Sequence, residues 1–182
     1  MKIPNIITLV RIFLIPCLVV AFYLPSEWSR YAAAGVFALA AATDWVDGYL
    51  ARKLNQATAF GAFLDPVADK LTVAVALIML VEGYTDIYLT LSAAIIVGRE
   101  LVISALREWM AEIGKRGSVS VSMLGKIKTG FQMSAIFFLL LAEPYSDLAN
   151  AAMLVLYCAA VLTVWSMWIY LKASWTELVR DL

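Results

Sequence analysis

Long apolar stretches alternate with short polar connections along the whole chain. Each stretch has about the 20 residues that a helix needs to cross a hydrocarbon layer roughly 30 Å thick. The pattern predicts six such helices, with the bounds Ile3–Leu24, Tyr31–Leu54, Phe63–Gly83, Ile87–Ala111, Lys126–Leu141 and Leu148–Leu171. We therefore predict an all-α, polytopic membrane protein with six transmembrane helices, which form a single domain over residues 1–182.

The connections differ in charge from one side of the predicted bundle to the other. PSEWSR, EGYTD and AEPYSD are short and mostly acidic, whereas ARKLNQATAFGAF and REWMAEIGKRGSVSVSMLGK are basic. When six helices are threaded from an inside N-terminus, every basic residue except Arg30 lies at or toward the same side. Because Lys and Arg are in excess in cytoplasmic loops, this pattern predicts that both termini are cytoplasmic.

Composition supports the membrane assignment and limits the chemistry. The chain is 63% hydrophobic and 15% charged, whereas soluble domains carry about 25% charged residues. Its 14 basic and 14 acidic residues balance, so no bulk charge favours nucleic acid as a partner. The sequence has no His, so a general base would be a carboxylate or, less readily, a Lys, Tyr or Cys. Cys17 and Cys158 lie inside apolar runs, which favours packing over a disulfide or a zinc site.

Four aspartates interrupt this apolar chain at the facing ends of the second and third predicted helices. Asp44 and Asp47 are three residues apart, and Asp65 and Asp69 are four apart, so each pair shares a helix face. If the two helices are antiparallel, both pairs meet at one depth in the membrane.

Four such carboxylates would repel one another and are costly to desolvate unless a counter-charge accompanies them. Oxygen ligands favour Mg²⁺, Mn²⁺ or Ca²⁺, and two such ions about 4 Å apart form a clamp for displacement at phosphorus. The alternative is that these are ordinary interfacial charges. The small residues Gly48, Ala51 and Gly61, which permit close approach, favour the metal site.

The spacing of these residues resembles the signature of the CDP-alcohol phosphotransferase family. Every position of the signature is matched, by Asp44, Asp47, Gly48, Ala51, Arg52, Gly61, Asp65 and Asp69. PNIITLVR, GRELVISALREWM and GKIKTGFQ are similar to the bacterial branch of the family that makes phosphatidylglycerophosphate. The resemblance therefore extends over essentially the whole chain.

The resemblance implies transfer of the phosphatidyl group of CDP-diacylglycerol to an alcohol, with release of CMP. It implies that Asp44, Asp47 and Asp65 hold two divalent cations, Mg²⁺ or Mn²⁺. Asp69 would be a further metal ligand or the general base for the acceptor hydroxyl. The CDP site would be formed by Asp44, Gly48, Ala51, Arg52 and Thr58. A homodimer in the bacterial inner membrane, with a polar cavity open to the cytoplasm, is also implied.

Basic residues on the fourth and fifth predicted helices suggest the acceptor. Charged side chains within membrane helices face an interior cavity by default, and a group of cations suits a phosphomonoester dianion such as glycerol 3-phosphate. The candidates are Arg99, Arg107, Lys126 and Lys128. Alternatively, the lysines extend to the lipid headgroups, and Arg99 forms an ion pair with Glu100 or a neighbouring helix. A polar stripe on the first helix, Asn5, Thr8 and Arg11, would form a wall of the same cavity.

We therefore expect an enzyme that makes phosphatidylglycerophosphate and CMP from CDP-diacylglycerol and glycerol 3-phosphate within the lipid bilayer. Other acceptors within the family are serine, inositol phosphate or a second phosphatidylglycerol. The alternative from another class is a cation transporter that uses the aspartates as its ion path. Transporter sites usually lie near the midplane between repeated halves, whereas these carboxylates lie toward one face and no repeat is visible.

Overall fold

The described part of the chain consists of six helices joined by short connections. A computed structural model describes residues 3–54, 59–114 and 123–179, although some side chains at the ends of these ranges lie outside the description. The helices are α1 (Ile3–Phe22), α2 (Ser29–Leu54), α3 (Ala59–Tyr84), α4 (Ile87–Glu112), α5 (Met123–Leu141) and α6 (Asp147–Leu178). Each predicted helix is confirmed, and the largest difference is at α6, which continues seven residues beyond the predicted Leu171.

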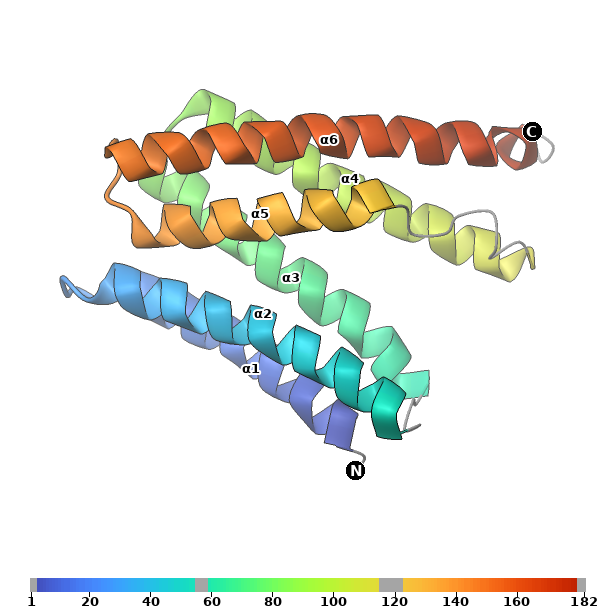
Figure 1. Cartoon of the computed structure of the whole chain (residues 1–182), viewed down its shortest axis with the longest axis horizontal. Helices are drawn as coiled ribbons and strands as arrows, with labels where there is room; N and C mark the ends of the chain where they lie inside the picture. Colours follow the sequence, from blue (N-terminus) through green and yellow to red (C-terminus); the bar gives the residue numbers. More distant parts are fainter. Residues whose placement is uncertain (1–2, 55–58, 115–122, 180–182) are drawn as a thin grey trace.

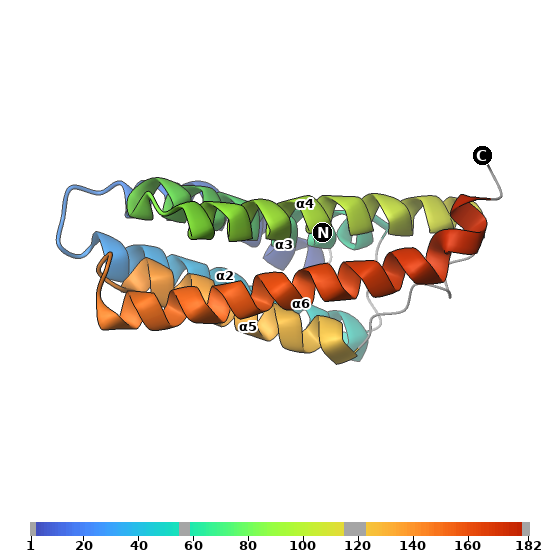
Figure 2. The same cartoon turned by 90° about the horizontal axis from the view of Figure 1, so that it is seen from above.

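The helices run along the long axis of the molecule in alternating directions, so both termini lie at the same end (Figure 1). Helix α1 packs against α2 and α3, α5 packs against α2 and α6, and α4 packs against α3 and α6. At the end that carries the termini, α4 and α6 extend beyond the other helices (Figures 1 and 2). A small apolar group that includes Ile103, Met110 and Tyr170 joins α4 to α6 there.

Apolar side chains cover the outside of the bundle as well as its core. Leu77, Leu80 and Ile136 are fully buried in the main core, while Phe13 and Val161 are each 69% exposed. A soluble monomer rarely exposes an apolar surface of this extent, so this exterior is suited to a lipid environment.

Three helices in the described residues are long and apolar enough to cross a membrane. Their spans are Asn5–Phe22, Ile87–Glu112 and Asp147–Lys172, and α5 contributes a shorter apolar segment, Ile127–Leu141. Helices α2 and α3 carry the aspartates, which lower their hydropathy. The six spans of the sequence prediction are thus supported for three helices and stay a prediction for the others.

The end opposite the termini is closed by hydrogen bonds between its turns. The Tyr145 hydroxyl donates to the carbonyl of Tyr84 at 2.7 Å, and the Tyr84 hydroxyl donates to the carbonyl of Leu139 at 2.8 Å. Arg30 on α2 forms an ion pair with Glu143, between α5 and α6, at 2.7 Å. Thr85 and Tyr145 both have a positive φ, of 48° and 65°, so these contacts hold two strained turns in place. The helices are therefore fixed at this end.

Candidate active site

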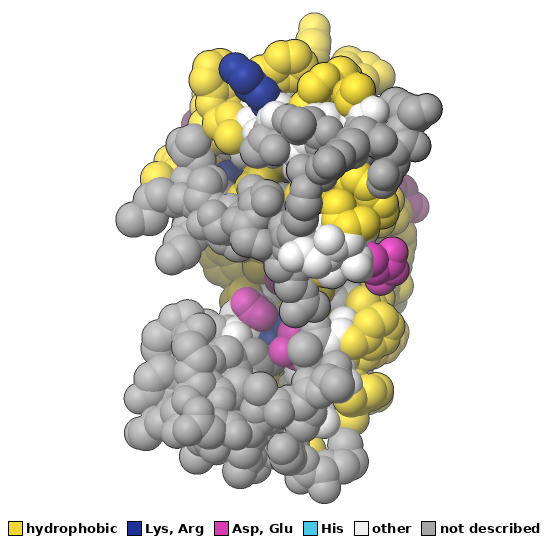
Figure 3. Space-filling view, turned by 90° about the vertical axis from the view of Figure 1, so that its right-hand side faces the viewer, with side chains coloured by type: hydrophobic (Ala, Val, Ile, Leu, Met, Phe, Trp, Pro, Cys, Tyr) yellow, Lys and Arg dark blue, Asp and Glu magenta, His cyan; other side chains and the backbone are white. Residues whose placement is uncertain are grey.

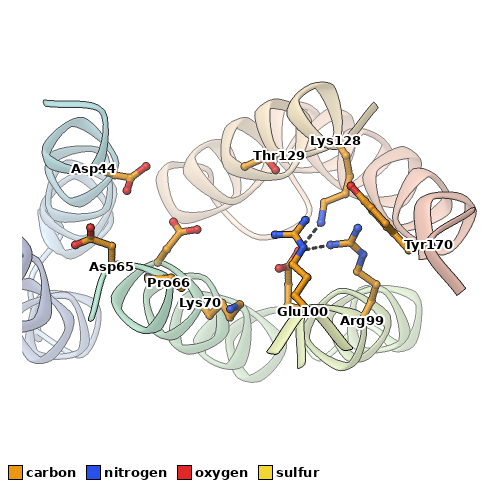
Figure 4. Close-up of a pocket in the computed structure, with 11 residues that line it drawn as sticks. Asp44, Asp65, Pro66, Lys70, Arg99, Glu100, Lys128, Thr129 and Tyr170 are labelled. Carbon is orange, nitrogen blue, oxygen red and sulfur yellow. Dashed lines mark hydrogen bonds and ion pairs between the residues drawn. The ribbon is translucent and has the colours of Figure 1, made fainter. Parts of the chain in front are cut away.

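A pocket of about 320 Å³ lies among the helices toward the end that carries both termini. Figure 3 looks onto that end and shows acidic side chains deep between the upper and lower parts of the molecule. The described lining residues come from α2 to α6: Asp44, Asp65, Pro66, Asp69, Lys70, Arg99, Glu100, Arg107, Lys128, Thr129 and Tyr170. Figure 4 shows that Asp44 and Asp65 lie at one side of this pocket and the cations Arg99 and Lys128 at the other.

The acidic side of the pocket joins α2 to α3, as the sequence predicts. Asp44 on α2 and Asp65 on α3 lie at the same side of the pocket (Figure 4), and Asp69 lines the same pocket. Asp65 and Asp69 lie farther into α3 than expected, because the helix begins at Ala59 rather than at Phe63. Pro66 is therefore inside the helix, where it leaves one backbone carbonyl without its helical partner.

Two residues of the polar stripe on α1 hold these carboxylates. The Thr8 hydroxyl donates to Oδ1 of Asp65 at 2.5 Å, and the Arg11 guanidinium lies 2.8 Å from Oδ1 of Asp44. Thr8 and Arg11 are each only 1% exposed. They therefore lie behind the carboxylates rather than among the described lining residues. Asn5 is half-buried in the same stripe.

Oxygen ligands for a hard divalent cation are available in this part of the pocket. Asp44, Asp65 and Asp69 supply carboxylates only, which are the ligands that Mg²⁺ and Mn²⁺ favour. Among the described side chains, no group of three or more His, Cys, Asp or Glu residues is spaced closely enough to hold a metal ion. The backbone of Asp47 belongs to α2, but its side chain lies outside the description. The residue types therefore fit a hard divalent cation, and a metal site stays a prediction, since the side chain of Asp47 lies outside the description.

Several residues expected at the nucleotide and acceptor sites also lie outside the description. They are Thr58 entirely, and the side chains of Gly48, Ala51, Arg52 and Lys126. Their predicted roles stay predictions.

The basic side of the pocket is organised by ion pairs between α4 and α5. One oxygen of Glu100, Oε1, accepts a hydrogen bond from Lys128 Nζ at 2.5 Å and another from Arg99 at 3.2 Å. Lys128 is 2% exposed and Arg99 is 7% exposed. A second nitrogen of Arg99 donates to the Ser166 hydroxyl on α6 at 3.0 Å. Lys128 therefore points into the bundle, contrary to the alternative in which it extends to the headgroups.

An aromatic ring links the two arginines of α4. The guanidinium carbons of Arg99 and Arg107 lie 5.6 Å and 5.7 Å from the centre of the Tyr170 ring, within cation–π range. Arg107 is exposed and lines the pocket. Of the two roles considered for Arg99, the ion pair with Glu100 is confirmed, and the side chain also lines the pocket.

Sequence reasoning missed the contribution of α6 to the pocket. Ser166 and Tyr170 are four residues apart and share the face that meets α4. A pair of hydroxyl side chains at this spacing within an apolar helix was an available signal. Lys70 also lines the pocket and donates to Ser104 on α4 at 2.6 Å, and no role was predicted for it from the sequence.

These features define a helical membrane protein whose pocket joins carboxylates to a group of buried cations. Residues 1–165 match the family model of CDP-alcohol phosphatidyltransferase. The chain belongs to this family.

Bacterial relatives match the chain over almost its whole length. A protein of Yersinia pestis (strain Pestoides F) is 54% identical over 180 residues, which cover 99% of this chain and 98% of the relative. A protein of Escherichia coli (strain K12) is 53% identical over 178 residues, which cover 98% of this chain and 97% of the relative. Both relatives are named CDP-diacylglycerol–glycerol-3-phosphate 3-phosphatidyltransferase.

Proposed function

We propose that this protein transfers the phosphatidyl group of CDP-diacylglycerol to the primary hydroxyl of glycerol 3-phosphate, giving phosphatidylglycerophosphate and CMP. The observation that carries the proposal is that carboxylates and cations line the same pocket. The carboxylates are those of Asp44, Asp65 and Asp69, and the cations are Arg99, Arg107 and Lys128. Carboxylates with divalent cations suit a diphosphate, and fixed cations suit the phosphate of the acceptor. The names of the full-length relatives support the same reaction.

The metal-binding residues in this proposal are Asp44, Asp47, Asp65 and Asp69, of which three line the described pocket. Two bound cations, Mg²⁺ or Mn²⁺, would neutralise the diphosphate and stabilise the leaving CMP. Thr8 and Arg11 fix the orientation of Asp65 and Asp44 through one oxygen of each carboxylate. The second oxygen of each carboxylate would then be available to a bound cation.

Asp69 is the proposed general base for the acceptor hydroxyl. It lines the pocket one helical turn after Asp65 on α3. A hydroxyl bound between the carboxylates and the basic group would lie beside Asp69, which can then accept its proton. Positioning of the hydroxyl contributes more to the rate than the basicity of a carboxylate does.

The nucleotide would be bound at the cytoplasmic end of α2 by Asp44, Gly48, Ala51, Arg52 and Thr58. Arg99, Arg107, Lys126 and Lys128 form the proposed site for the acceptor. These assignments rest on the family signature and, for Asp44, Arg99, Arg107 and Lys128, on their position in the pocket.

The proposal includes an arrangement in the membrane. A single domain would span the bacterial inner membrane six times, with both termini and the open end of the pocket in the cytoplasm, and would form a homodimer. Both termini and the pocket lie at the same end of the molecule, which supports this orientation. The basic character of the connections at that end supports it as well.

The test is an acceptor assay with the purified full-length protein in lipid–detergent micelles. CDP-diacylglycerol and Mg²⁺ are supplied with glycerol 3-phosphate, serine or inositol phosphate, and both CMP and the lipid product are measured. We expect CMP release that depends on glycerol 3-phosphate and yields phosphatidylglycerophosphate. Release that depends on another acceptor would replace glycerol 3-phosphate in the proposal, and cation flux without CMP release would support a transporter.

A further inference from the structure

The cations at the basic side of the pocket differ in how many of their donors the protein already uses. Arg99 is 7% exposed. One of its terminal nitrogens donates to Glu100 and the other donates to Ser166, and its guanidinium lies against the Tyr170 ring. Both terminal nitrogens of Arg99 are therefore held by the protein, whereas its Nε has no hydrogen-bond partner among the described residues. Of the three partners of Arg99, Arg107 contacts only the Tyr170 ring. Its side chain is exposed and lines the pocket.

Glu100 is an anion in the middle of a group of cations that is suited to bind another anion. Its Oε1 lies 2.5 Å from Lys128 Nζ and 3.2 Å from Arg99. Dashed lines in Figure 4 join the carboxylate to both side chains. Two cations that contact the same carboxylate oxygen lie close together, and they repel each other strongly where little water screens them. Lys128 is only 2% exposed. The shared oxygen of Glu100 therefore holds together two cations that would otherwise separate.

Lys128 keeps donors for a ligand while Glu100 holds it. An ammonium group has three N–H bonds, and the hydrogen bond to Glu100 uses one of them. If the carboxylate were absent, Lys128 would lose the ion pair and the hydrogen bond that fix the direction of its ammonium group. The orientation of the ammonium toward the acceptor thus depends on Glu100.

We propose that Glu100 is a positioning residue for the acceptor, which keeps Lys128 directed at the phosphate of glycerol 3-phosphate. Lys128 and Arg107 contact the phosphate, whereas Arg99, Ser166 and Tyr170 form the support that fixes Glu100 and Arg107. The inference rests on the proposed function, because it assigns roles within that acceptor site. It opposes the simplest electrostatic expectation, in which removal of an anion from a phosphate site strengthens phosphate binding.

The experiment compares Glu100→Gln with the wild type in the purified full-length protein, with Mg²⁺ and both substrates varied. We expect the KM for glycerol 3-phosphate to rise about 10- to 100-fold, as for the loss of a charge-assisted contact. The KM for CDP-diacylglycerol and the kcat at saturating acceptor should stay within about three-fold. The reason is that the substitution weakens acceptor binding equally in the ground state and in the transition state. Glu112→Gln is the matched control, since Glu112 is exposed near the end of the same helix and is not among the described lining residues.

A double-mutant cycle tests whether Glu100 acts through Lys128. When Lys128 is already Gln, the additional change Glu100→Gln should raise the KM for glycerol 3-phosphate by less than about two-fold, because coupled residues are not additive. An undiminished effect in that background would show that Glu100 does not act through Lys128 and would overturn the inference.

The remaining outcomes are also decisive. A KM for glycerol 3-phosphate that is unchanged or lower in Glu100→Gln would mean that Glu100 is only a counter-charge, which overturns the inference. Parallel changes in kcat and in both KM values would indicate a purely structural role, with the same consequence. If Glu100→Gln does not fold, Glu100→Asp replaces it, with a smaller rise in the same KM expected and an unchanged KM overturning the inference. Failure of the proposed function looks different, since the wild type would then release no CMP in response to glycerol 3-phosphate.

Discussion

Arg11 is a buried side chain that fixes the position of a carboxylate at the acidic side of the pocket. Its guanidinium is 1% exposed, whereas the Asp44 side chain that it contacts is 51% exposed. A buried charge is tolerated only with a partner, and the Asp44 carboxylate is one such partner of Arg11. Asp44 then serves both as that partner, through Oδ1, and as a proposed metal ligand on its exposed side.

Asp44→Asn should lower the turnover rate by at least about 100-fold at saturating Mg²⁺, because the amide keeps the shape of the side chain but loses the charge that binds metal. The measurement is CMP release from CDP-diacylglycerol and glycerol 3-phosphate, with the amount of folded protein in membranes determined in parallel. Asp147→Asn, in the first turn of α6 at the opposite end, is the control and should be fully active. Near-normal activity of Asp44→Asn would show that the metal assignment is wrong.

Asp69→Asn should differ in kind from Asp44→Asn. As the proposed base, Asp69 contributes to the chemical step rather than to substrate binding. We expect a decrease of about 100-fold or more in kcat, at the lower end of the contribution of general-base catalysis, while CDP-diacylglycerol binding stays within a few-fold of normal. Binding of the lipid substrate is measured alongside turnover. If binding and metal occupancy are lost together with the rate, Asp69 is mainly a metal ligand.

At the scale of single helices, the sequence predicts the elements well because each helix is one long apolar stretch between polar turns. The faces of α2 and α3 that carry the aspartates follow from their spacing of three and four residues. Helix α3 begins at Ala59, four residues before Phe63, where the apolar pattern predicts its start. The contacts of Arg99 with Ser166 and Tyr170 join residues more than 60 positions apart, and no local pattern contains such pairings.

Helix α4 begins at a capped turn whose stability can be measured. The Asp86 carboxylate accepts a hydrogen bond from the Leu89 backbone N–H at 2.8 Å, and the Tyr157 hydroxyl on α6 donates to the same oxygen at 3.4 Å. Asp86→Ala removes the cap and should cost about 1 kcal/mol of unfolding free energy. For a chain of this size that corresponds to a decrease of about 2–4 °C in the Tm.

The Tm is measured by thermal unfolding of the purified protein in detergent. Asp86→Asn is the matched control, because Asn caps helices about as well as Asp, and its Tm should stay close to that of the wild type. Equal losses in the two variants would mean that the charge of Asp86, rather than the cap, stabilises this turn.

At the scale of the whole molecule, the two ends of the bundle differ in structure and in chemistry. One end is closed by the hydrogen bonds of Tyr84 and Tyr145 and by the ion pair of Arg30 with Glu143. The other end carries both termini and the pocket. The difference between the two ends was predictable from the sequence, because the lengths of the helices and the charges of the connections indicate which connections lie at the same end. The pairing of acidic and basic sides in one pocket required the structure.

The orientation in the membrane can be tested with single cysteines at the two ends. In a background with Cys17 and Cys158 replaced by Ala, Glu27→Cys lies in the exposed turn between α1 and α2, and Glu112→Cys lies exposed at the end of α4. A membrane-impermeant maleimide should label Glu27→Cys on intact cells, whereas Glu112→Cys should be labelled only after the inner membrane is opened. The reason is that Lys and Arg gather at the pocket end, and such ends stay in the cytoplasm.

The reverse labelling pattern would place the pocket on the outer side, away from the cytoplasm. Labelling of both positions on intact cells would mean that the described helices do not all cross the bilayer. Only the expected pattern agrees with a pocket that takes a water-soluble acceptor from the cytoplasm. Because both cysteines lie outside the pocket lining described here, the variants should retain activity, and the assay then reports orientation for a functional protein.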